Sequence, residues 1–148
     1  MRKKPITQDA KVLSQLALLH DEADMRAARL WWHDAFWPEN AADYLKIELA
    51  HGTKQSRWLK QVTTYWGMAT SLVLDGSLSE KALLNAELSR EMFTVFAKVR
   101  PFLNQLRKRT DNPDFMANLE AFILRSKAAR KRLQLEIQGS AGRRKTRK

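Results

Sequence analysis

The chain has 148 residues, no cysteine, and 27 Lys and Arg residues against 16 Asp and Glu residues, a formal net charge of +11. This length suits one domain with a core of its own, and the lack of cysteine excludes disulfide frameworks and thiolate chemistry. The longest uncharged run, residues 61–74, is shorter than the roughly 20 apolar residues that cross a bilayer, so we expect a cytoplasmic protein with no integral membrane segment.

The excess positive charge lies in the last third of the chain. Residues 1–97 hold 12 basic and 12 acidic side chains, whereas residues 98–148 hold 15 basic and four acidic ones. A one-sided positive charge attracts nucleic acid, acidic lipid or an acidic protein.

Apolar residues in the first half recur at helical spacing and predict four helices. Asp21 is the expected N-cap of the second helix, and Pro38 should end it because the residue before a proline avoids helical geometry. Gly76 should close the fourth helix in the left-handed conformation. The predicted ranges are 9–19, 21–37, 39–50 and 53–74, and the expected inner face of the second helix comprises Met25, Ala28, Trp32 and Phe36.

The second half predicts two further helices. The first opens with a capping box at Ser77 and Glu80 and continues to Leu106, with a kink at Pro101. The second opens at Asn112 as N-cap and runs to about Ile137.

These elements predict an all-α fold, a compact bundle of five or six mostly antiparallel helices. We expect one helical-bundle domain over residues 1–138. Gly139 should end the last helix and leave residues 139–148 as a disordered or frayed basic tail.

Four phrases recur in a characteristic order: MRAARLWW at 25–32, LDGSLSEKALL at 74–84, FAKVRPFL at 96–103 and NPDFMANLEAF at 112–122. In this order and spacing the chain resembles a bacterial family of domains of unknown function, family 4760, over about residues 25–130. The resemblance implies a helical architecture. It carries over no catalytic residue, because none is established for such a family.

The motifs of familiar enzymes are missing from the sequence. The letters DEAD at 21–24 come without the glycine-rich phosphate loop that a helicase needs. His20, His33 and His51 are not spaced to place two metal ligands on one helix face, and no serine lies in a G-x-S-x-G elbow. We therefore expect no catalytic residue, metal or cofactor and favour a non-enzymatic role, with an enzyme of unrecognised site as a further alternative.

The segment WWHDAFW at 31–37 is the most unusual in composition. Trp32 and Phe36 fit the inner face of the second predicted helix, whereas Trp31 and Trp37 fall on its flanks. Neighbouring helices can cover these flanking rings. Alternatively, Trp31 and Trp37 form a protein interface, because tryptophan is enriched at binding hot spots.

Basic side chains in the last third are candidates for contacts with phosphate or with an acidic partner. They are Arg125, Lys127, Arg130, Lys131, Arg132, Arg143, Arg144, Lys145, Arg147 and Lys148. Our first hypothesis for the function is an interaction module with a protein partner or a second copy of itself. The alternative is a protein that binds nucleic acid non-specifically through these phosphate contacts.

Overall fold

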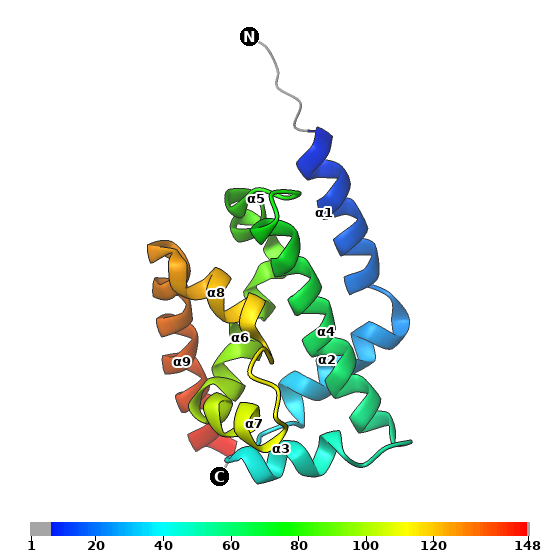
Figure 1. Cartoon of the computed structure of the whole chain (residues 1–148), viewed down its shortest axis with the longest axis vertical. Coiled ribbons are helices and arrows are strands. Elements are labelled where there is room, and N and C mark those ends of the chain that lie inside the picture. Colours follow the sequence, from blue (N-terminus) through cyan, green and yellow to red (C-terminus); the bar gives the residue numbers. More distant parts are fainter. Residues whose placement is uncertain (1–6, 148) are drawn as a thin grey trace.

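The computed structural model describes the backbone of residues 7–147 and the side chains of residues 8–139, and all regular structure in that part of the chain is helical (Figure 1). It confirms the all-α class, although the helices are shorter and more numerous than the five or six that we expected. The helices are α1 (Thr7–His20), α2 (Ala23–Asp34), α3 (Ala41–Glu48), α4 (Lys54–Leu74), α5 (Glu80–Asn85), α6 (Arg90–Val99), α7 (Leu103–Arg109), α8 (Ala117–Arg125) and α9 (Lys127–Arg147), with 3-10 turns η1 (Glu87–Ser89) and η2 (Arg100–Phe102).

Helix α4 is the central element of the bundle. Helices α2, α3 and α8 pack directly against it, and α9 packs against α6 and α8 on the other side of the molecule (Figure 1). One continuous apolar core extends from Leu16 in α1 to Leu133 in α9. Its largest fully buried side chains are Trp32, Trp66, Tyr44, Phe93, Phe96 and Phe122.

The periodicity of the first half predicted four helices and the buried face of α2 correctly. All four residues expected on the inner face of α2 are buried, and Gly76 ends α4 with a φ of +88°. The cap of α2 was predicted wrongly, because Glu22 holds the N-cap position and its Oε1 accepts a hydrogen bond from the Met25 N–H. Helix α2 also ends three residues earlier than expected, at Asp34.

The long helix expected from Ser77 to Leu106 is interrupted twice. Ala86 adopts an extended conformation, with φ −72° and ψ 136°, and so ends α5. Pro101 has no N–H to donate, and the chain forms the 3-10 turn η2 around it. The N-cap of α5 is Ser79, whose Oγ accepts from the Ala82 N–H, and not Ser77.

The last expected helix divides into α8 and α9. Asn112 does not cap a helix, because α8 begins only at Ala117, after Met116 in the left-handed region (φ 60°). Ser126 is extended and its Oγ accepts from the Ala129 N–H, so it separates the two helices and caps α9. Gly139, the expected helix end, lies inside α9, because a single glycine costs only about 1 kcal/mol in a helix.

Candidate functional site

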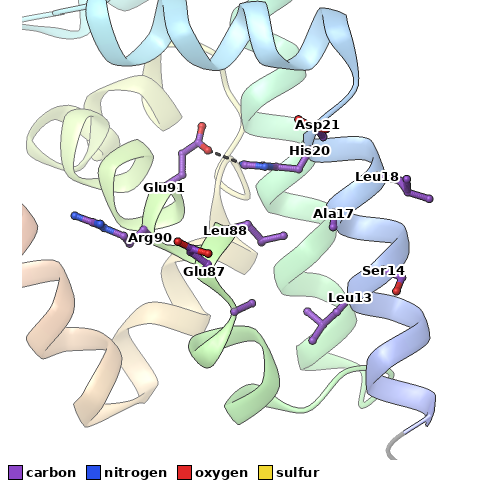
Figure 2. Close-up of a pocket in the computed structure, with 11 residues that line it drawn as sticks. Leu13, Ser14, Ala17, Leu18, His20, Asp21, Glu87, Leu88, Arg90 and Glu91 are labelled. Atoms are coloured by element: carbon purple, nitrogen blue, oxygen red, sulfur yellow. Dashed lines mark hydrogen bonds and ion pairs between the residues drawn. The ribbon is translucent and has the colours of Figure 1, made fainter.

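A groove of about 1010 Å³ lies between α1 and the segment that leads from α5 into α6 (Figure 2). We call it the α1–α6 groove. Its apolar lining comes from Leu13, Ala17 and Leu18 on one wall and from Ala86 and Leu88 on the other. Its charged and titratable side chains are His20, Asp21, Glu87, Arg90 and Glu91.

The groove stays open because α1 is attached mainly near its two ends. Near the start of α1, Asp9 Oδ1 accepts a hydrogen bond of 3.1 Å from the Ser79 N–H, and at its end His20 is bonded to α6. Between these points Leu16 is the one α1 side chain, among those described, that is fully buried, and the Tyr65 hydroxyl donates to its backbone oxygen at 2.6 Å. Leu18 lies two residues from Leu16 on the outward side of α1, where its side chain points away from α6 (Figure 2) and is 74% exposed.

A polar cluster of His20, Glu91 and Arg29 closes one end of the groove. His20 Nε2 lies 2.6 Å from Glu91 Oε1, and Arg29 Nη1 lies 3.7 Å from the same oxygen. The His20 ring packs against Tyr65 and Trp66 at centroid distances of 5.6 and 6.0 Å. The cluster therefore joins α1, α2 and α6 at one point.

The Tyr65 hydroxyl below this cluster stays protonated. Burial raises the pKa of Tyr65 well above its ordinary value, the nearby Glu91 charge raises it further, and Arg29 opposes the shift. A protonated hydroxyl is what the hydrogen bond to the Leu16 oxygen requires. Tyr65 is thus a fixed donor in the wall of the site and not an acid or base.

A His–Glu pair of this geometry also resembles an oriented general base. A serine nucleophile would have to lie within hydrogen-bonding reach of the histidine. Ser14, the hydroxyl side chain that lines the groove, is six residues before His20 on the same helix, a rise of about 9 Å. The groove therefore does not assemble a Ser–His catalytic pair.

A second hollow of about 610 Å³ continues from the groove and lies between α2, α6 and α9. Arg90 and Glu91 line both hollows and so connect them. We call the second hollow the arginine cleft, because Arg26, Arg29 and Arg90 line it. The remaining residues that line it are Leu30, His33, Asp34, Thr94 and Glu136.

A buried lysine fixes the end of α2 beside the arginine cleft. Lys98, only 3% exposed, donates from Nζ to the backbone oxygens of Trp32, His33 and Phe36, the last at 2.7 Å. The final carbonyl groups of a helix have no partner within that helix, and Lys98 supplies one from α6. Its ammonium also lies 3.9 Å from the centroid of the Trp37 ring.

The two tryptophans expected at an interface are partly buried and in contact with neighbouring groups of the same chain. Trp31 stacks on Phe36 at a centroid distance of 4.8 Å and packs near Trp58 at 6.2 Å. Trp37 covers Lys98, and its Nε1 donates to the Asp34 backbone oxygen at 3.2 Å. The structure therefore places both rings at the end of α2, outside the α1–α6 groove.

The basic residues expected to contact phosphate have different surroundings. Arg125 pairs with Glu80 at 3.2 Å, and Arg130 donates to the Leu124 backbone oxygen. Arg132 donates to the Leu84 oxygen and lies 4.6 Å from the centroid of the Phe93 ring, so it holds α9 against the bundle. Lys127 and Lys131 are exposed one turn apart. The side chains of Arg143, Arg144, Lys145 and Arg147, and all of Lys148, lie outside the described residues.

Sequence reasoning missed the residues that form the groove and the cleft. The available signal was the excess of apolar residues in α1, where Leu18 cannot share one face with Leu16. In the part of the chain that the structure describes, no group of His, Asp and Glu is arranged to hold a metal ion. Within the same part, no helix is long and apolar enough to cross a membrane.

Comparison with known proteins identifies one relationship. A family model described as a domain of unknown function (DUF4760) matches residues 5–126, which include α1 through α8. No curated protein and no solved structure matches the chain.

Proposed function

Given that the chain belongs to the DUF4760 family, we propose that it is a non-enzymatic interaction module that pairs with a second copy of itself. The α1–α6 groove of one copy receives the exposed face of α9 from the other. The observation that carries the proposal is Leu18, which is 74% exposed at the outer rim of an open groove (Figure 2). Large apolar side chains exposed around a hollow mark interaction sites.

Charge supports a second copy as the occupant of the groove. Three carboxylates, those of Asp21, Glu87 and Glu91, line the groove against the single guanidinium of Arg90. This acidic lining belongs to a chain whose net charge is +11. A second copy of the chain therefore offers the basic surface that the groove lacks.

Helix α9 presents a complementary stripe. Lys127, Lys131 and Leu135 follow one another at intervals of four residues, which places them along one helix face. All three are exposed, Leu135 to 61%. The stripe thus combines positive charge with an apolar anchor, as the groove combines negative charge with apolar walls.

The arrangement of the two surfaces supports a closed dimer. Arg90 lines the α1–α6 groove and also a smaller hollow that contains Leu135, so the Leu135 end of the stripe lies near the groove. In a two-fold dimer the groove of each copy meets the stripe of the other, and both contacts form together.

Substitution of Leu18 tests this proposal. We expect the wild-type chain to approach twice its 17.2 kDa mass by sedimentation as concentration rises, and Leu18→Lys to remain near the mass of one chain. The lysine removes an apolar contact and adds a positive charge to a groove that receives a basic helix. Dimerisation should weaken roughly tenfold or more.

The matched control is Leu49→Lys, which places the same charge at a 61% exposed leucine after α3. This variant should dimerise like the wild type. Glu87→Lys and Lys131→Glu should each weaken the dimer, and an equimolar mixture of the two should restore it, because each then offers the charge that the other lacks. A wild-type chain that stays monomeric at every concentration, or an equal loss in Leu49→Lys, would contradict the proposal.

A second candidate function is non-specific binding of nucleic acid. The observation that favours it is the exposed pair Lys127 and Lys131, since no acidic residue occurs between Glu120 and Glu136. Replacing both lysines with glutamine should reduce the slope of log affinity against log salt by about 1.4 on a single strand. Binding of a 20-nucleotide single strand, measured by fluorescence anisotropy at several salt concentrations, gives this slope.

The control for this experiment is the double replacement Lys46→Gln and Lys60→Gln, which removes the same charge from exposed positions on α3 and α4. Its slope should match that of the wild type. If both double variants lose binding equally, the charge of α9 has no special role. If the wild type does not bind near physiological salt, the candidate is excluded.

A further inference from the structure

The side chains that line the arginine cleft carry more hydrogen-bond donors than the acceptors of the cleft can engage. Three guanidinium groups line it, those of Arg26, Arg29 and Arg90, together with the imidazole of His33. Three carboxylates also line it, so the balance depends on which of these groups are already engaged.

The carboxylates of the cleft have partners. Asp34 Oδ1 lies 3.1 Å from His33 Nδ1, and Glu91 Oε1 is shared by His20 and Arg29. Glu136 takes part in an interaction of its own. These acceptors therefore leave the arginines only partly satisfied.

The arginines, by contrast, retain unused donors. Arg90 is exposed and makes no ion pair or hydrogen bond from its side chain to any described residue. Arg29 Nε is buried without a hydrogen-bond partner among the described residues. Arg26 reaches only Asp21, at 3.9 Å, and both side chains are more than half exposed (56% and 76%).

The charge of Arg90 also acts on a neighbouring guanidinium outside the cleft. Arg132 in α9 has its pKa lowered, first by burial and then by the charge of Arg90. An anion between α2, α6 and α9 would offset this repulsion.

We propose that the arginine cleft binds the phosphate group of a small phosphorylated ligand. A phosphate offers three oxygens and up to two negative charges, which suits three guanidinium groups that line one cleft better than the two oxygens of a carboxylate do. The volume of about 610 Å³ leaves room for more than the phosphate and lies within the usual range of ligand sites. Leu30, 64% exposed at the edge of the cleft, offers an apolar surface to the rest of the ligand.

Pyrophosphate is the probe for this site, measured by isothermal titration at constant ionic strength. We expect the wild-type chain to bind it and Arg90→Gln to bind at least about tenfold more weakly, since charge-assisted hydrogen bonds to one guanidinium are lost. Arg90 makes no contact that the fold depends on, so this variant should keep the melting temperature of the wild type.

The matched control is Arg100→Gln, which removes an exposed arginine of η2 that does not line the cleft. Its affinity for pyrophosphate should stay within twofold of the wild type. Absence of binding by the wild type, or an equal loss in Arg100→Gln, would overturn the assignment. Succinate binding as tightly as pyrophosphate would replace phosphate with carboxylate as the group recognised, and so would overturn it as well.

This site shares Arg90 and Glu91 with the groove of the proposed dimer, but the two proposals can be tested separately. Pyrophosphate binding should persist in Leu18→Lys, because Leu18 lines the groove and not the cleft. A chain that binds pyrophosphate but stays monomeric would contradict the dimer alone, and a chain that dimerises without binding pyrophosphate would contradict the phosphate site alone.

Discussion

Replacing Lys98 with methionine should lower the free energy of unfolding by about 3 kcal/mol, because each buried acceptor left without a donor costs roughly 1–3 kcal/mol. The lost ammonium donates to three backbone oxygens at the end of α2 and lies against the Trp37 ring. Methionine fills a similar volume but donates nothing. In a chain of this length the melting temperature should fall by roughly 10 °C, which calorimetry or denaturant titration can measure.

The variant Lys98→Arg should not keep the stability of the wild type, although it keeps the positive charge. A planar guanidinium cannot direct three donors to three carbonyl oxygens around a compact point, as an ammonium does. Lys60→Met is the control, since Lys60 is exposed on α4 and should tolerate the change with little effect. If Lys98→Met unfolds within about 0.5 kcal/mol of the wild type, the end of α2 does not depend on this lysine.

The position of Lys98 among apolar residues indicated burial, but helical periodicity alone did not show whether its ammonium group reaches solvent. Lys98 lies three residues after Val95 and next to Val99, both fully buried, so it falls within the apolar face of α6. A lysine in such a position either extends its ammonium to solvent or finds acceptors inside. The acceptors belong to residues more than 60 positions earlier in the chain, and local sequence does not encode that distance.

The buried faces of α2 and α4 could be predicted because helical periodicity depends only on neighbouring residues. The same periodicity did not predict the breaks between helices at Ala86 and Ser126. Ala86 is a good helix former that adopts an extended conformation, so its packing overrides its local preference. Ser126 is a typical N-cap, but no proline or glycine stood next to it to indicate the end of α8.

The candidate sites depend entirely on contacts between distant segments. His20 and Glu91 are 71 residues apart in the sequence, yet their bond sets one end of the α1–α6 groove. In the sequence, His20 and Arg29 belonged to an ordinary helix end and an ordinary helix face. They form part of the site because α6 lies beside them. The order of the helices along the chain does not predict that position of α6.

Glu91→Leu should be the second most damaging of these substitutions, with a loss of about 2–3 kcal/mol in the free energy of unfolding. Glu91 Oε1 is the acceptor for His20 and the ion-pair partner of Arg29, whose side chain is only 20% exposed. Without the carboxylate, a largely buried guanidinium keeps its charge with no partner. Denaturant titration measures the loss.

The same change should release the end of α1. The bond from His20 to Glu91 joins that end to α6, so hydrogen exchange of the amides of Leu18, Leu19 and His20 should accelerate at least tenfold beyond the change in the α4 amides. Glu91→Gln keeps an acceptor oxygen and should give an intermediate result. Glu87→Leu is the control, since Glu87 is exposed in the same groove and its side chain has no partner among the described residues.

A local release of α1 connects stability with the proposed function. Helix α1 forms one wall of the α1–α6 groove, so a chain that must first order this wall forms a dimer at an added entropic cost. Glu91→Leu should therefore weaken the dimer more than Glu87→Leu, although both remove one negative charge from the groove. If the two variants exchange alike and dimerise alike, the His20–Glu91 bond does not hold α1 in place, and the Leu16 contacts alone position that wall.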